Sequence, residues 1–161
     1  KKAFIGFITA GDPSLDKTEE FILEMEKAGA ALVEIGIPFS DPIAEGPVIQ
    51  EANLRALSAG CTTDKIFDMV AKLRKKTQIP LAFMAYANSL YKYGYDRFCK
   101  RCAEVGIDGL IIPDMPLEEK CPECGQMLFK KKGKPLAVCH NKECSYKCDY
   151  VDKTDTDKAK V

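Results

Sequence analysis

The stretch VEIGIPFSDPIAEGPVIQ, residues 33–50, decides the fold of the first part of this chain. It opens with an almost continuous apolar run, which is typical of a parallel strand covered on both faces. Glu34 interrupts that run. Because an unpaired carboxylate is costly in such a strand, Glu34 is either a satisfied core acid or a proton-transfer group. Glycines and prolines shape the rest of the stretch into a loop that carries Ser40, Asp41 and a second carboxylate, Glu45, and functional residues often gather on such loops.

Composition excludes some function classes. The 161 residues include 24 basic and 24 acidic side chains, so the formal net charge is zero and no global field draws the chain to nucleic acid or membrane. No apolar run approaches a membrane span and no signal peptide is recognised, so we expect a cytoplasmic protein. Because thiols stay reduced in that compartment, the eight cysteines, most of them near the carboxyl end, are interpreted first as metal ligands.

Hydrophobic patterns on both sides of the opening stretch predict alternating strands and helices. The predicted strands are 3–9, 32–37, 79–86 and 109–112, and the predicted helices are 16–28, 47–59, 64–75 and 95–105. This alternation implies right-handed parallel connections and hence an α/β domain. Four polar residues fall at or near predicted strand ends: Thr9, Glu34, Tyr86 and Asp114.

Four segments together carry a resemblance to a known family. They are FIGFITAGDP at 4–13, GIPFSDPIAEGP at 36–47, YAN at 86–88 and IIPDMPLE at 111–118. Over about residues 1–119 the sequence resembles the tryptophan synthase alpha chain family. The resemblance implies the amino-terminal half of a TIM (β/α)8 barrel, with four parallel strands, ending before the fourth helix of the barrel. In such barrels the active site lies at the carboxyl ends of the strands.

The resemblance also implies a reaction. The family cleaves indole-3-glycerol phosphate to indole and glyceraldehyde 3-phosphate by a retro-aldol step, without a cofactor. By resemblance Glu34 is the general acid/base and Glu45 is the acid that holds the indole N–H. The family commonly has Asp at the second position, so this carboxylate reaches one methylene further. The alternative for Glu45 is a loop acid without a catalytic role.

Further residues match the substrate pocket of the family. Phe7, Tyr86 and Asp114 occupy pocket positions, and Met84 matches less specifically. From the residues alone, Phe7 is equally a core residue, Tyr86 a strand-end aromatic residue and Asp114 a turn residue or helix cap.

Three loop residues match positions through which the family meets its pyridoxal-phosphate-dependent beta chain: Pro38, Asp41 and Asn88. Asp41 is equally suited to capping its own loop. In the family the substrate phosphate is held by the second half of the barrel, to which this sequence shows no match. We therefore expect negligible cleavage by the chain alone. Four parallel strands would also leave two open edges and an uncovered inner face, which favours self-association as a dimer or an aggregate, or local disorder.

The cysteines near the carboxyl end form two knuckles, CPECG at 121–125 and CHNKEC at 139–144. Paired thiolates close tight turns on one metal, and two such pairs supply tetrahedral zinc with four ligands, here Cys121, Cys124, Cys139 and Cys144. His140 and Cys148 are nearby alternatives. This region resembles the zinc ribbons at the carboxyl end of bacterial type I topoisomerases. Cys99 and Cys102 share a C-x-x-C spacing but fall in a predicted helix, so they are interpreted as packing residues.

A basic segment lies between the knuckles. KKKGK at 130–134 supplies Lys130, Lys131, Lys132 and Lys134. With Phe129, Tyr146 and Tyr150, these lysines form the combination seen where single-stranded nucleic acid lies on a small sheet. The alternative is a solvated hairpin loop, and four lysines give only weak, salt-sensitive attraction.

The sequence thus predicts a half barrel at 1–119, a small β zinc ribbon at 120–151 and a disordered tail at 152–161. Three interpretations remain open. The chain is a carbon–carbon lyase, a nucleic-acid-binding zinc module on an inert α/β fragment, or a fusion or truncation product without full activity. The abrupt change at residues 119–121, without a linker, favours the third.

Overall fold

The computed structural model describes residues 2–43, 45–117, 119–131 and 134–150. The chain divides into two compact units, Lys1–Pro113 and Asp114–Val161. The predicted disordered tail, 152–161, lies outside the described residues. The boundary between the units falls earlier than the predicted one, so Asp114 belongs to the second unit.

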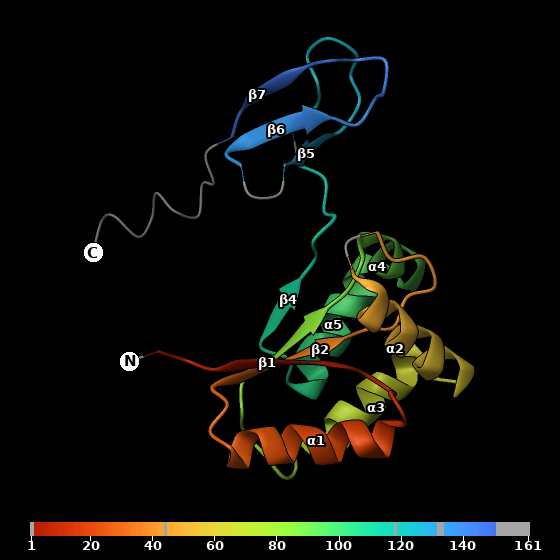
Figure 1. Cartoon of the computed structure of the whole chain (residues 1–161), viewed down its shortest axis with the longest axis vertical. Coiled ribbons are helices and arrows are strands. Elements are labelled where there is room, and N and C mark those ends of the chain that lie inside the picture. Colours follow the sequence, from red (N-terminus) through yellow and green to blue (C-terminus); the bar gives the residue numbers. More distant parts are fainter. Residues whose placement is uncertain (1, 44, 118, 132–133, 151–161) are drawn as a thin grey trace. The chain divides into compact units, whose positions relative to one another are not determined.

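The first unit alternates strands and helices (Figure 1). Its elements are β1 (Ile5–Thr9), α1 (Leu15–Lys27), β2 (Leu32–Gly36), α2 (Pro47–Ser58), α3 (Thr63–Leu73), β3 (Leu81–Met84), α4 (Ala87–Tyr93), α5 (Tyr95–Val105) and β4 (Gly109–Ile111). The four strands form one parallel sheet in the order β1-β2-β3-β4. This arrangement confirms the predicted α/β class and the sequential order expected of a half barrel.

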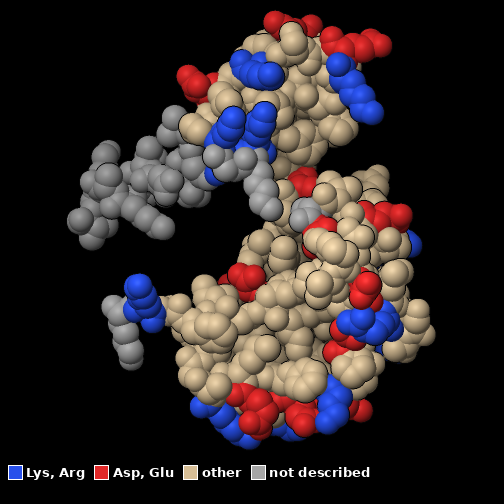
Figure 2. All heavy atoms as spheres, in the orientation of Figure 1, with Lys and Arg blue, Asp and Glu red and all other residues tan. Residues whose placement is uncertain are grey.

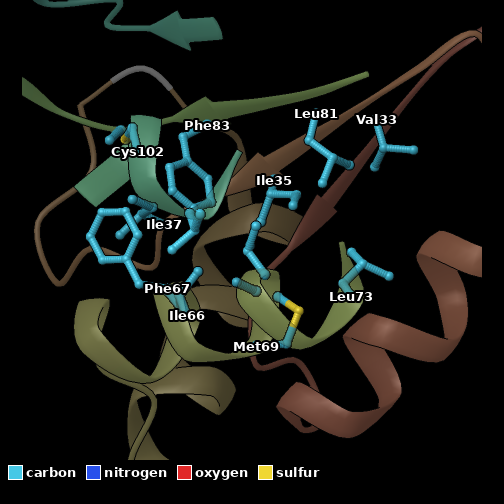
Figure 3. Packing of buried hydrophobic residues seen from close by; sticks show 14 of the residues in the cluster. Val33, Ile35, Ile37, Ile66, Phe67, Met69, Leu73, Leu81, Phe83 and Cys102 are labelled. Carbon is cyan, nitrogen blue, oxygen red and sulfur yellow. The ribbon is translucent and has the colours of Figure 1, made fainter. Parts of the chain in front are cut away.

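One face of this sheet packs against helices. Val33 and Ile35 of β2 and Phe83 of β3 are fully buried, and they meet residues of α3 such as Phe67 (Figure 3). The ring centroids of Phe67 and Phe83 are 5.5 Å apart, in an edge-to-face arrangement that favours aromatic pairs. Because α1, α3 and α5 all contribute to this cluster, the hydrophobic core lies on this face of the sheet.

Local signals explain where several helices begin. Ser14 precedes α1 and its side chain accepts a hydrogen bond from the Lys17 N–H, while Thr62 caps α3 in the same way. Pro47 opens α2, as predicted, because its missing N–H costs nothing at the first helical position. The short helix α4 was not predicted.

The second unit contains a three-stranded antiparallel sheet in the order β5-β6-β7. The strands are β5 (Leu128–Lys130), β6 (Leu136–Cys139) and β7 (Lys147–Asp149). Leu128, Ala137 and Cys121 are buried and form a small core, against which the other clustered cysteines pack. Such a core is small, and domains of this size usually need a metal or disulfides for stability.

Within the described part of the chain, the structure contains no helix with the length and hydropathy that a bilayer span requires.

Candidate functional site

The uncovered face of the parallel sheet carries the first predicted catalytic residue. Glu34 pairs in register with Phe7 on β1 and with Ala82 on β3, so the three side chains share one face. This face is opposite to the one that presents Val33 and Ile35 to the helices. Glu34 and Phe7 are both half-buried. No hydrogen bond or ion pair joins the Glu34 carboxylate to the described residues, so its oxygens are available to a ligand.

Met84 lies further along the same face, towards the carboxyl ends of the strands. It pairs with Gly36 on β2 and Ile111 on β4, and it is half-buried. The structure therefore brings Phe7, Glu34 and Met84 together on one face. This placement agrees with a ligand site at the strand ends, which is where parallel α/β proteins bind their ligands.

The loop after β2 carries the second predicted catalytic residue, Glu45. Asn53 on α2 donates a hydrogen bond from Nδ2 to Oε2 of Glu45 across 3.3 Å, and the Gln50 side chain donates to the Glu45 carbonyl across 2.9 Å. Asn53 is only 4% exposed. Asn53 was not among the residues predicted from the sequence, although a polar residue between alanines on the inner face of a helix is a usable signal.

Tyr86 ends the connection from β3 to α4 and is 3% exposed. Its ring centroid lies 5.1 Å from that of Phe39, which comes from the loop after β2. The aromatic pair joins two loops that follow neighbouring strands. Asp114, the fourth residue matched to the substrate pocket, belongs to the second unit.

A cavity of about 460 Å³ opens beside the same loops. Pro38 and Asn88, both predicted to meet a partner chain, line it together. The third such residue, Asp41, is exposed and accepts a hydrogen bond from the Ser40 hydroxyl at 2.5 Å. This bond within the loop agrees with the alternative role of Asp41, which was to cap its own loop.

An ion pair ties the loop after β1 to α2. Arg55 donates from Nε and Nη2 to the two carboxylate oxygens of Asp12, across 2.9 and 2.8 Å. This hydrogen bonding by Arg55 lowers the pKa of Asp12 below its ordinary value. Both residues line a second cavity, of about 280 Å³, and Phe7 is another of its lining residues. The pair therefore fixes one wall of the space beside Phe7.

The second unit groups the four predicted metal ligands. The Sγ atoms of Cys121, Cys124, Cys139 and Cys144 all lie within 4.8 Å of one another. The closest pairs are Cys124 with Cys139, at 3.4 Å, and Cys121 with Cys144, at 3.7 Å. Four thiolates bound about 2.3 Å from one zinc ion are about 3.8 Å apart. The set therefore fits a tetrahedral metal ion.

Backbone hydrogen bonds shape the two knuckles. The Gly125 N–H donates to the Cys121 carbonyl and the Cys121 N–H donates to the Gln126 carbonyl. Gly125 has φ +71°, a conformation that residues with a Cβ rarely adopt. A hydrogen bond from the Gln126 backbone and a second from the Cys139 thiol lower the pKa of Cys124 to about 7. A lowered pKa favours the thiolate form, which is the form that binds metal.

The remaining cysteines play other roles. Cys102 is buried on α5, and burial raises the pKa of its thiol to about 12, as expected of a packing residue. Cys99 is exposed, so its interpretation as a packing residue was wrong. It lies three residues earlier on the helix, on the solvent side. Cys61 is also buried, with the pKa of its thiol raised to about 11 by burial. Cys148 packs against the small core of the second unit.

The predicted nucleic-acid surface is only partly described, because Lys132 lies outside the described residues. Lys130, Lys131 and Lys134 are exposed, and the Lys130 Nζ lies 5.3 Å from the ring centroid of Tyr150. Tyr150 and Tyr146 pack against the cysteine core.

Strand register places Phe129 on the opposite face of the small sheet. Phe129 pairs with Val138, which in turn pairs with Lys147, whereas the core face carries Leu128, Ala137 and Cys148. Phe129 therefore does not share a face of the small sheet with Tyr146 and Tyr150.

Comparison with known proteins decides the family. A model of the family described as "Tryptophan synthase alpha chain" matches residues 1–133. The chain belongs to the tryptophan synthase alpha chain family. A tryptophan synthase alpha chain from Alkaliphilus metalliredigens is 59% identical over 120 residues, which is 74% of this chain and 45% of that relative.

Solved alpha-chain structures support the same fold. Tryptophan synthase subunit alpha from Legionella pneumophila matches with a TM-score of 0.70 and 44% identity, over 72% of this chain and 45% of that one. A chain from the tryptophan synthase a2b2 complex of Pyrococcus furiosus matches with a TM-score of 0.68 and 38% identity, over 71% and 46%. The chain thus spans about half the length of its tryptophan synthase relatives. Its first unit has the four parallel strands of the amino-terminal half of a TIM barrel.

Proposed function

We propose that the first unit carries the acid–base residues of an indole-3-glycerol phosphate lyase. The observation that carries this proposal is the position of Glu34. Its carboxylate lies on the uncovered face of the sheet, beside Phe7, and makes no hydrogen bond or ion pair within the described chain. A core acid would have a partner, because unpaired buried carboxylates are costly. A carboxylate kept for a ligand would not.

In the proposed reaction Glu34 transfers protons. As the bond between indole C3 and the glycerol carbon breaks, C3 gains a proton from the Glu34 carboxylic acid. The adjacent hydroxyl loses its proton as that carbon becomes the aldehyde of glyceraldehyde 3-phosphate. The same carboxylate is suited to both transfers, since the step needs no net proton, oxidant or metal.

Glu45 would orient the indole ring by accepting a hydrogen bond from its N–H. The contact with Asn53 supports this role, because it fixes the longer glutamate side chain from α2. Phe7 and Met84 on the same face as Glu34, and Tyr86 at the end of the next strand, would supply apolar contact area for the indole. We assign Asp114 to the substrate pocket by family resemblance alone.

The chain alone should cleave this substrate very slowly. In the family the phosphate is held by the second half of the barrel, and remote binding energy of that kind positions the reacting atoms. Its loss should lower the rate at least about a hundred-fold. The test is a sensitive assay of indole release with purified chain. We expect a small residual rate that Glu34→Gln abolishes and that Glu51→Gln, an exposed acid on α2, leaves unchanged.

Two outcomes of that assay would contradict the proposal. If the residual rate survives Glu34→Gln, Glu34 does not transfer the proton. If indole release is fast, the first unit does not need the phosphate-binding half that its relatives contain.

We also propose a beta chain as a partner of the first unit. Pro38 and Asn88 line one cavity of about 460 Å³, so residues from two loops would contact the same partner surface. The similar Pyrococcus furiosus chain comes from a tryptophan synthase a2b2 complex, which supports such a pairing. A binding assay with a purified beta chain tests it, with Asn88→Ala expected to weaken binding and Lys100→Ala, on the exposed side of α5, expected to leave it unchanged.

For the second unit we propose a zinc ribbon with one structural zinc ion. Four sulfur atoms within 4.8 Å of one another support this choice of metal, since an all-thiolate set favours zinc or iron–sulfur centres. A cytoplasmic location would keep these thiols reduced. Elemental analysis should find one zinc per chain, reduced by Cys124→Ser and unchanged by Cys148→Ser. Iron instead of zinc, or no metal, would contradict it.

Nucleic-acid binding is the second candidate function. Phe129 and His140 place their ring centroids 5.1 Å apart, on the opposite face from the cysteine core and close in sequence to the exposed lysines. We propose weak, non-specific binding of single-stranded nucleic acid there, in line with the resemblance of this unit to topoisomerase zinc ribbons. Oligonucleotide binding should disappear at high salt and after Phe129→Ala. Binding that resists salt would contradict this assignment.

A further inference from the structure

The parallel sheet of the first unit has two open edges. β1 and β4 are the outermost strands, and no strand of the described chain pairs with the outer side of either. An open edge exposes a row of unpaired N–H and C=O groups, which is a template for another strand.

Hydrogen-bond directions identify the groups at these edges. The Ala10 N–H donates to the Gly36 carbonyl, and peptide groups alternate in direction along a strand. The N–H and C=O groups of Ile5 and Phe7 therefore point away from β2. On β4 the Ile111 carbonyl accepts from the Ala85 N–H, so the groups of Leu110 point away from β3.

Neither edge strand carries the charges or prolines that often protect an edge against pairing, although β4 is only three residues long. Natural edge strands carry charged residues, prolines or bulges, but the residues of β1 and β4, IGFIT and GLI, include no charge and no proline. Ile5 is 52% exposed and Leu110 is 36% exposed. The side of the unit next to β1 and β4 carries few charged side chains, whereas acidic and basic groups gather along α1 (Figures 1 and 2). This pattern is typical of a surface that is covered.

We infer that a second copy of this chain covers both edges and completes an eight-stranded parallel barrel. A two-fold axis parallel to the strands places β4 of each copy beside β1 of the other, so all strands stay parallel and no edge remains. Pairing β1 with β1 would instead be antiparallel and would leave both β4 edges open. Eight is also the number of strands that closes a parallel barrel with a filled interior.

Side chains at the two edges are complementary in this arrangement. Leu110 pairs in register with Phe83, so it lies on the helix side of β4. On the same side of β1, Phe21 of α1 and Ile8 line one cavity, and Phe21 is 40% exposed. The junction would bring Leu110 of one copy against Phe21 and Ile8 of the other. The formal net charge of zero means that two copies do not repel each other.

This inference rests on the sheet and not on the proposed lyase chemistry.

Analytical ultracentrifugation of the zinc-loaded full chain tests the dimer. We expect a species of twice the 17.8 kDa chain mass. Ile5→Pro and Leu110→Pro each remove one outward N–H without removing a bond inside the sheet, and each should give monomer. Mixing the two variants should restore partial association. The β4 edge of the Ile5→Pro chain and the β1 edge of the Leu110→Pro chain are both intact, so one junction can still form. Ile43→Lys, at an exposed loop residue away from both edges, should leave the dimer unchanged.

Several results would overturn the inference. A monomeric chain at all concentrations would exclude it, and species that grow beyond the dimer would show edges that do not close. A Leu110→Pro variant that dimerises fully would show β1-to-β1 pairing. Because a proline can disturb folding, Ile5→Lys serves as a second variant, and circular dichroism must show native helix content in every variant that becomes monomeric.

Discussion

Asn53 Nδ2 donates to Glu45 Oε2 across 3.3 Å, so a buried amide on α2 fixes a carboxylate on the loop after β2. Replacing Asn53 with Ala should lower the free energy of unfolding by about 1 kcal/mol, because the hydrogen bond is lost while water still solvates the half-buried carboxylate. Urea denaturation monitored by circular dichroism measures this change. Gln50→Ala is the control, since its amide bonds the Glu45 carbonyl at the surface and should matter less.

Arg74 should be the most sensitive charged residue of the first unit. Its guanidinium donates to the carbonyls of Gly106 and Ile79 and to the Asp108 carboxylate, across 2.8, 2.6 and 2.6 Å. Arg74→Ala leaves these acceptors without this donor and should lower the free energy of unfolding by about 2 kcal/mol or more. Arg97→Ala, which removes an exposed ion pair at 3.9 Å, should cost under about 1 kcal/mol. If urea denaturation shows that Arg74→Ala and Arg97→Ala lower the free energy of unfolding equally, the ranking is contradicted.

The pair of Asp12 and Arg55 predicts a pH dependence. Since the folded-state pKa of Asp12 lies below its ordinary value of 3.8, its stabilising contribution is complete above that value and is lost as pH falls through the folded-state pKa. Asp12→Asn should therefore lower the urea midpoint near neutral pH but have little effect in strong acid. In a background that carries Arg55→Gln, Asp12→Asn should leave the urea midpoint unchanged at every pH. A constant difference across pH would show that Asp12 acts by packing alone.

Metal removal should change which thiols react. In the zinc-loaded chain we expect fast reaction with a thiol reagent at the exposed Cys99, and slow reaction at the buried Cys61 and Cys102. A strong chelator should release the four clustered cysteines and unfold the second unit, because metal binding and folding are coupled in such small domains. Circular dichroism of the helices should barely change. Unchanged thiol reactivity after chelation would mean that no metal protects the cluster.

Sequence patterns predicted the parallel sheet because buried strands and amphipathic helices differ clearly in period. The structure confirms these elements with shifts of a few residues at their ends. The helix α4 escaped prediction because only Leu90 among its seven residues is buried and Tyr86 caps it without a side-chain hydrogen bond. Such a helix is formed by its surroundings rather than by its own pattern.

The site was harder to predict where it depends on spatial neighbours. Cysteine spacing alone predicted a four-sulfur cluster, because the ligands of each knuckle are close in sequence. The hydrogen bond between Asn53 and Glu45 depends on where α2 lies relative to the loop after β2, and hydrophobic periodicity carries no information on that position. Likewise, spacing could not show that Phe129 and Tyr146 lie on opposite faces, since that depends on register between strands.

The contacts of Arg74 lie at the amino ends of β3 and β4, whereas Glu45 and Tyr86 follow the carboxyl ends of β2 and β3. The groups that hold the sheet together and the groups offered to a ligand are therefore separated by the length of the strands. As a result, substitutions around Arg74 should change the stability of the first unit without altering the proposed ligand-binding loops after β2 and β3. The two properties are free to evolve at different rates, and an engineer can adjust one while leaving the other as it is.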